Sequence, residues 1–149
     1  MANVVTSTPI PTALLDAEFT RADVELHGLD HSGASYEGRV FLNLPSAGEQ
    51  TPRAVPEYAG SYFVFGHGGC LGDPGHCDAK PRRFYDPRPE HPLTPTVKVV
   101  IATAAIRRAI GGADAITVMI VPILLATNKA VGEPVDLVHF EQVRIVTYR

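Results

Sequence analysis

Short stretches of alternating hydrophobic and polar residues recur along the chain, and this pattern is typical of β-strands with one buried face. The clearest stretch is Tyr36 to Leu44, in which Val40, Leu42 and Leu44 share one face. The segment Thr96 to Ala102 is rich in β-branched residues, which predicts a strand packed on both faces. Further strands are predicted within residues 14–26, 62–65, 114–125 and 135–148.

The remaining segments have the composition of one short helix and of long connections. Thr103 to Ile110 contains residues that favour a helix, and Gly111 and Gly112 predict its C-cap. Five prolines between residues 80 and 95 exclude a helix or a central strand there. Pro122 predicts an edge position or a bulge near the end of its strand. Residues 1–12 are predicted to form an extended N-terminal arm.

These elements predict a single all-β domain over residues 1–149, mainly an antiparallel β-sandwich or a partly closed barrel, with one short helix and long loops rich in proline and glycine. A chain of 149 residues is long enough to bury a core of its own.

Charge and hydropathy narrow the possible partners and locations. The net charge is −3 and there is no run of basic residues, which argues against nucleic acid as a partner. No apolar run reaches about 20 residues, so no membrane span is expected. The N-terminus lacks the basic leader and apolar run of a signal peptide. A cytoplasmic location is therefore the default expectation, with export alongside a partner as the alternative.

The glycine-rich segment 66–78 contains both cysteines of the chain. His67, Cys70, His76 and Cys77 fall within eleven residues, and thiolate and imidazole are ligands that copper and zinc prefer. However, their spacing matches no standard zinc pattern, because the neighbours His76 and Cys77 tend to point apart. A copper or zinc site formed by these four residues is one hypothesis for the segment.

Two other interpretations of the same segment stay open. A disulfide between Cys70 and Cys77 would close an eight-residue hairpin, and this bridge, or a pair of reduced thiols, fits the spacing better than a metal site. A thiol nucleophile with His67 or His76 as its base is the least favoured, because the sequence shows no third, orienting group.

A second pair of histidines, His27 and His31, has the spacing that would align two imidazoles on one helix face. The residues between and around them, Gly28, Asp30 and Gly33, disfavour a helix. The segment from His27 to Ser35 is therefore predicted to be a surface turn rather than a metal site.

The order of these elements resembles the C-terminal β-domain that follows the catalytic domain in plant polyphenol oxidases and some bacterial tyrosinases. Three features carry the resemblance, which covers residues 36–148. The first is the AGSY strand at Ala59 to Tyr62, which follows a proline-rich loop. The second is the segment Val97 to Gly112, a strand that leads into a short helix and a glycine turn. The third is the Val121–Pro122 pair at the end of an apolar strand.

The resemblance implies an accessory role in a type-3 copper system. In that family the β-domain packs over the dicopper site and shields it, and related small caddie proteins assist copper loading. The implied partner is a tyrosinase-like copper enzyme. A second copy of the chain is the alternative, because strand edges and the apolar segment Ile116 to Leu125 would offer an interface.

The family also suggests which side chains would contact the partner. An aromatic residue of the β-domain can occupy the substrate pocket of the copper enzyme, and Tyr58, Tyr62 and Tyr85 are the candidates here. The chain itself is not expected to carry the oxidase activity, because its six histidines are scattered and no pair of helices is predicted to hold them. The sequence and the resemblance together favour a non-catalytic accessory or assembly protein. The alternative is a metal-binding module that holds or delivers copper or zinc through the four ligands predicted in segment 66–78, which are His67, Cys70, His76 and Cys77.

Overall fold

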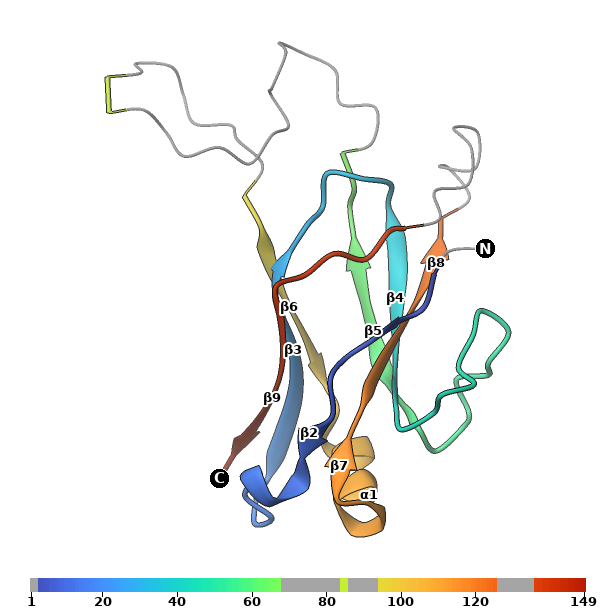
Figure 1. The fold of residues 1–149 in the computed structure, drawn as a ribbon, viewed down its shortest axis with the longest axis vertical. Coiled ribbons are helices and arrows are strands. Elements are labelled where there is room, and N and C mark those ends of the chain that lie inside the picture. Colours follow the sequence, from blue (N-terminus) through green and yellow to red (C-terminus); the bar gives the residue numbers. More distant parts are fainter. Residues whose placement is uncertain (1–2, 68–83, 86–93, 126–135) are drawn as a thin grey trace.

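The computed structural model describes residues 3–67, 84–85, 94–125 and 136–149. Their elements, shown in Figure 1, are β1 (Val5–Thr6), β2 (Ile10–Pro11), a 3₁₀ turn (Thr12–Leu14), β3 (Arg21–Leu29), β4 (Tyr36–Leu42), β5 (Tyr58–Val64), β6 (Thr96–Ile101), α1 (Thr103–Gly112), β7 (Ala115–Ile116), β8 (Val118–Leu124) and β9 (Gln142–Tyr148).

The strands form two larger sheets and one small one, and every pair is antiparallel. The four-stranded sheet has the order β1-β8-β4-β5, the three-stranded sheet has the order β6-β3-β9, and β2 pairs with β7. The prediction of an antiparallel β fold with one α-helix is confirmed, and the described strands do not close into a barrel. No helix in the described part of the chain is long and apolar enough to cross a membrane.

The core lies between the two larger sheets, because alternate residues of each strand point inward. Val24 and Leu26 of β3 face Val40 of β4, and all three are fully buried. The helix α1 contributes Ile106 to the same core. Burying side chains of this size contributes about 1.5–3 kcal/mol each, so this core supplies most of the favourable free energy of folding.

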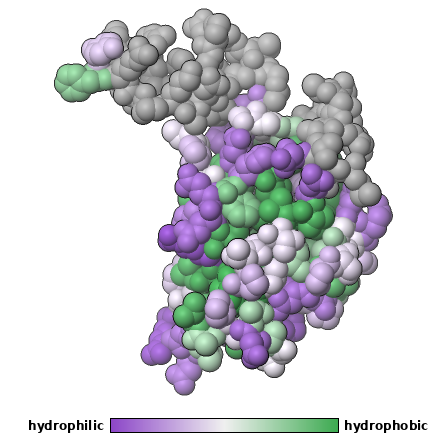
Figure 2. All heavy atoms as spheres, viewed as in Figure 1, coloured by the Kyte–Doolittle hydropathy of each residue, from purple (hydrophilic) through white to green (hydrophobic). Residues whose placement is uncertain are grey.

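The side of the sandwich seen in Figure 1 is crossed by the N-terminal segment and by residues 136–141. Val5 pairs with Ile120 of β8, and Ile10 pairs with Ile116 of β7. Leu137 is also buried against the core. Figure 2 shows apolar residues in the middle of this face and polar residues around them. The N-terminal arm is therefore extended and paired along the sandwich.

A second, smaller core covers the outer face of the four-stranded sheet. The loop that follows β4 brings Ala47 against Phe41, Met119 and Val121. These residues are buried, and β8 lies between β1 and β4. The apolar segment Ile116 to Leu125, which was expected to offer an interface, is buried within the chain from Val118 to Pro122, whereas Ile123 to Leu125 are half-buried.

Strand β3 is longer than its composition suggests. The segment His27 to Ser35 was expected to be a turn, but β3 continues to Leu29. Gly28 adopts a φ of 66°, and the pairing with β6 shifts register between Leu26 and Leu29. A glycine at a β-bulge interrupts the alternating pattern without ending the strand, which explains the misassignment.

Three further expectations were wrong in part. The strand predicted from Leu14 is a 3₁₀ turn and an irregular segment, and Leu14 is 77% exposed. The helix α1 continues through Gly111 and Gly112, and its C-cap is Ala113 in an extended conformation. The strand β6 is packed on one face only, because Val99 and its outward neighbours are exposed.

Pro122 occupies the kind of position that its missing N–H group requires. β8 pairs with β4 along its whole length, but β1 pairs only with Met119 and Ile120. Pro122 therefore lies beyond the end of β1, where no hydrogen-bond donor is needed on that side.

Candidate functional site

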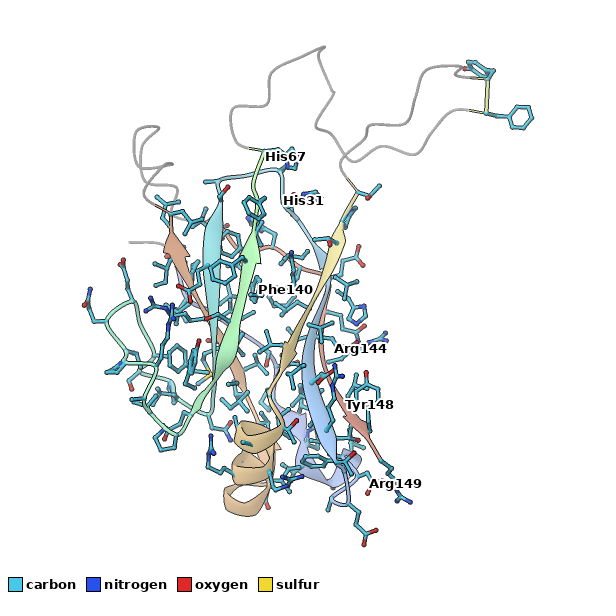
Figure 3. All side chains as sticks on the ribbon, turned by 180° about the vertical axis from the view of Figure 1, so that it is seen from behind. His31, His67, Phe140, Arg144, Tyr148 and Arg149 are labelled. Carbon is cyan, nitrogen blue, oxygen red and sulfur yellow. The ribbon has the colours of Figure 1, made fainter. Side chains whose placement is uncertain are left out.

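Of the four predicted metal ligands, only His67 lies within the described residues. Cys70, His76 and Cys77 fall outside them, and so does the predicted disulfide between Cys70 and Cys77. His67 lies three residues after the end of β5, at the upper end of the sandwich in Figure 3.

The structure places His67 beside His31, 36 residues earlier in the chain. The two rings meet edge to face, with centroids 5.1 Å apart and an interplanar angle of 76° (Figure 3). The backbone N–H of His67 donates to the carbonyl oxygen of His31 over 3.0 Å, which ties the end of β5 to the loop that follows β3.

Each ring of this pair also has one nitrogen close to a backbone carbonyl oxygen. His31 Nε2 lies 2.7 Å from the oxygen of Thr94, and His67 Nδ1 lies 3.3 Å from the oxygen of His31. The pairing of His27 with His31 is not formed. His27 lies within β3, where its Nε2 contacts Glu25 Oε2 at 2.7 Å.

The three tyrosines considered as partner contacts have different environments. Tyr62 is only 4% exposed, and its ring packs edge to face on Tyr36 with centroids 6.0 Å apart. It is therefore a core residue and presents no surface to a partner in this structure. Tyr58 is half-buried, and its hydroxyl hydrogen-bonds Ser61 Oγ at 2.7 Å. Tyr85 is 79% exposed, so its ring is accessible.

A buried carboxylate lies near Tyr58, on the outer face of the four-stranded sheet. Glu37 accepts hydrogen bonds from Ser61 at 2.7 Å and from Arg53 at 2.6 Å, and it also pairs with Arg39 at 3.3 Å. Burial disfavours the charged form, but the hydroxyl of Ser61 and the two guanidinium groups outweigh it and lower the pKa of Glu37. Because Arg53 belongs to the loop that follows β4 and Glu37 belongs to β4 itself, this network fastens the loop to the sheet.

An apolar surface runs along the two neighbouring edge strands β5 and β6. The structure describes ten large hydrophobic residues that are exposed, and five of them lie on β5, on the residue after it or on β6. We call these five the β5–β6 surface: Phe63 (53% exposed), Phe65 (82%), Val97 (47%), Val99 (47%) and Ile101 (63%).

The two strands of this surface belong to different sheets but lie next to one another. A Cβ built on Gly60 of β5 would come within 2.6 Å of Val100 Cγ1 of β6. Among the described strands, each of the two pairs with one neighbour in its sheet, β5 with β4 and β6 with β3. Figure 3 shows both strands on the side opposite to that of Figure 1. This surface was not predicted from the sequence, because the β-branched residues of β6 indicated a strand with both faces in the core.

A shallow pocket lies between α1 and the loop after β4. Its volume is about 240 Å³, and its walls include Leu42, Glu57 and Arg108. Ligand pockets are commonly about 300–1,000 Å³. The guanidinium of Arg108 already donates two hydrogen bonds to the carbonyl oxygen of Pro56. This pocket is therefore smaller than a typical ligand site, and the guanidinium of Arg108 is already engaged in it.

Comparison with solved structures shows that this fold is similar to that of a domain found in polyphenol oxidases. The matching structures are of latent aurone synthase, a polyphenol oxidase. The recombinant protein co-crystallized with hexatungstotellurate(VI) has a TM-score of 0.55 and 12% identity, and the protein from its natural source has a TM-score of 0.54 and 11% identity. Each match covers 98% of this chain and 24% of the other.

The predicted resemblance to a polyphenol oxidase domain is thus confirmed at the level of the fold. The chain spans about a quarter of the length of the polyphenol oxidases that it matches. No protein-family model matches the sequence, and no curated protein matches it.

Proposed function

We propose that this chain is a non-catalytic accessory domain that docks on a tyrosinase-like copper enzyme through the β5–β6 surface. The observation that carries the proposal is the row of exposed aromatic and β-branched side chains on these two strands. The shared fold supports the choice of partner, because the matching segment is a quarter of a polyphenol oxidase chain.

The composition of the β5–β6 surface suits a protein interface. Phe63 and Phe65 are rigid aromatic anchors, and residues of this kind are enriched in the buried centres of interfaces. Each side chain of the surface still exposes about half of its area or more. Covering that area contributes roughly 1 kcal/mol or more per side chain. Exposed apolar side chains that gather on neighbouring strands are typical of protein contact sites.

A copper enzyme explains this surface better than a second copy of the chain does. A two-fold pairing of β6 with the β6 of another copy would bring both copies of Lys98 close together, because Lys98 lies in the middle of the strand. Like charges at neighbouring positions of an antiparallel pair are destabilising, and lysines on edge strands discourage such pairing. The same lysine does not oppose an acidic or apolar partner.

Affinity capture with the purified chain as bait tests the proposal. Extracts of cells that produce the chain are passed over immobilised wild-type protein, and retained proteins are identified by mass spectrometry. They are also assayed for copper and for diphenol oxidase activity. We expect a copper oxidase whose activity falls when free chain is added, because the docked domain covers its active site.

Two variants make this experiment specific. Phe65→Ser on the β5–β6 surface should abolish retention of the oxidase, whereas Leu14→Ser, at an exposed leucine outside that surface, should not. Retention of the oxidase by both variants, or retention of no copper oxidase by the wild type, would contradict the proposal. A mass of twice 16.0 kDa by light scattering would instead identify self-association as the use of this surface.

A further inference from the structure

We infer that His31 and His67 form a binding site for one Cu²⁺ ion at the end of the sandwich. The two histidines come from segments far apart in the sequence, the loop after β3 and the end of β5. Their rings lie 5.1 Å apart, and His67 is exposed while His31 is half-buried. An ion from solvent can therefore reach both rings.

The hydrogen bonds of the pair fix which nitrogen of each neutral ring carries its proton. A carbonyl oxygen can only accept, so His31 Nε2 donates to Thr94 and His67 Nδ1 donates to His31. The other two nitrogens, His31 Nδ1 and His67 Nε2, then carry free lone pairs. Histidines that ligate metals typically donate their second N–H to a carbonyl or carboxylate oxygen, which orients the ring and raises its basicity.

The separation of the rings fits two ligands of one ion. Metal–nitrogen bonds of about 2.0–2.1 Å place the centres of two ligating imidazoles roughly 4.5–5.2 Å apart for ligand angles between square-planar and tetrahedral. The observed separation of 5.1 Å falls within this range. The spacing of the two rings therefore needs no movement of the strands for both rings to ligate one ion.

The ligand set favours Cu²⁺ over other divalent ions. Imidazole suits both copper and zinc, and for a given set of ligands the affinity for Cu²⁺ is the highest of the first-row series. No third histidine, cysteine, aspartate or glutamate joins the pair among the described residues. Water or the ligands of another protein would complete the coordination, so a bound ion would be exchangeable. This inference does not rest on docking to a copper enzyme.

Titration of the purified chain with copper sulfate tests the site. The experiment starts from a parent variant that carries Cys70→Ser, His76→Ala and Cys77→Ser, so that of the four ligands predicted in the glycine-rich segment only His67 remains. Calorimetry should give one Cu²⁺ per chain, and electron paramagnetic resonance should show two coupled imidazole nitrogens. Adding His31→Ala or His67→Ala should lower the affinity at least tenfold and remove one coupled nitrogen.

His27→Ala is the matched control, because His27 lies on β3 only four residues before His31 but contacts Glu25 instead. It should leave the affinity and the spectrum of the parent unchanged. Circular dichroism and thermal unfolding check that each variant is folded. Equal copper binding by the parent and by folded His31→Ala overturns the site, and tighter binding of zinc than of copper overturns the choice of metal. Since only the isolated chain is used, either failure leaves the capture experiment unaffected.

Discussion

Gly38 of β4 lies directly against the ring of Tyr62 in β5. The two residues are cross-strand partners, and a Cβ built on Gly38 would come within 2.2 Å of Tyr62 Cζ. Tyr62 is only 4% exposed, so its ring fills the space above the glycine and cannot swing into solvent. Packing, rather than an unusual backbone angle, therefore requires glycine at this position.

Gly38→Ala should destabilise the protein by about 1–3 kcal/mol, because overpacking a full core forces side chains and backbone to shift. The free energy of unfolding can be measured by urea denaturation. The double variant Gly38→Ala with Tyr62→Val removes the ring that clashes, so its destabilisation should be smaller than the sum of the two single effects. Simple additivity would show that the two residues do not constrain each other.

The hydroxyl of Tyr62 gives a second prediction. Within the described part of the chain, neither this hydroxyl nor that of Tyr36 forms a hydrogen bond of good geometry, although both are buried. Burial is the main cause that raises the pKa of both groups, and the two hydroxyls lie close enough to shift the pKa of each other. A buried polar group without a partner costs free energy. Tyr62→Phe should therefore leave the stability equal to that of the wild type or raise it. Tyr62→Leu, which also removes the ring, should cost about 2–4 kcal/mol.

A marked loss of stability in Tyr62→Phe alone would contradict this account. It would indicate that the two hydroxyls bond to each other directly or through an ordered water, since either contact satisfies buried polar groups.

The alternation of apolar residues predicted most of β4, because Val40 and Leu42 lie in the main core as expected, but the strand ends at Leu42 and Leu44 packs against the second core instead. This alternation did not reveal that the outward face of β6 is exposed. Val97, Val99 and Ile101 have the composition of a core strand, and an exposed apolar strand has the same pattern as a buried one. Only the topology, which leaves β6 at the edge of its sheet, distinguishes the two cases.

The candidate site was harder to predict for a different reason. His31 and His67 are separated by two strands, β4 and β5, and short-range spacing instead suggested pairing His31 with His27. The register of the antiparallel pairs decides which loops meet at one end of a sandwich. Sequence periodicity does not specify register between strands of different hairpins, so the His31–His67 pair emerged only from the structure.

The buried carboxylate of Glu37 should make part of the stability depend on pH. Glu37→Gln removes the charge that Arg53 and Ser61 stabilise, and should cost about 1.5–3 kcal/mol at neutral pH. The folded pKa of Glu37 is lowered from its ordinary value of 4.5. Its contribution is therefore complete well above pH 4.5 and is lost as the pH falls through the lowered folded pKa.

Urea denaturation at pH 7 and at a series of pH values below 4.5 checks this prediction. The difference between the wild type and Glu37→Gln should shrink toward the acidic end. Glu18→Gln, at an exposed glutamate, is the control and should change stability by no more than about 0.5 kcal/mol at any pH. A difference that stays constant with pH would mean that the charge of Glu37 is not what stabilises the loop.

Asn43 ends β4 in a conformation that few residues adopt, with a φ of 54°. Its side chain donates to the carbonyl oxygen of Ala115 at 3.1 Å and accepts from the N–H of Thr117 at 2.7 Å, which holds the junction of β7 and β8. Asn43→Ala and Asn43→Gly should each lose these hydrogen bonds, at about 0.5–1.5 kcal/mol per bond. Alanine should cost roughly 1 kcal/mol more than glycine, because it is strained at positive φ. Equal stability of the two variants by thermal unfolding would contradict the backbone argument.

Substitutions on the β5–β6 surface should affect binding without affecting folding. Val99→Thr and Ile101→Thr keep a β-branched side chain on β6, and both residues point away from the core. Each should change the free energy of unfolding by no more than about 0.5 kcal/mol, whereas Val100→Thr, at a residue that is only 4% exposed, should destabilise clearly.

Urea denaturation gives the free energy of unfolding of Val99→Thr, Val100→Thr and Ile101→Thr, and so compares outward and inward positions of β6. If Val99→Thr destabilised as much as Val100→Thr, the outward face of β6 would be packed within the chain itself. The β5–β6 surface would then be unavailable for a partner. If instead the outward variants fold normally and lose the captured copper oxidase, the exposed apolar side chains act in recognition and not in folding.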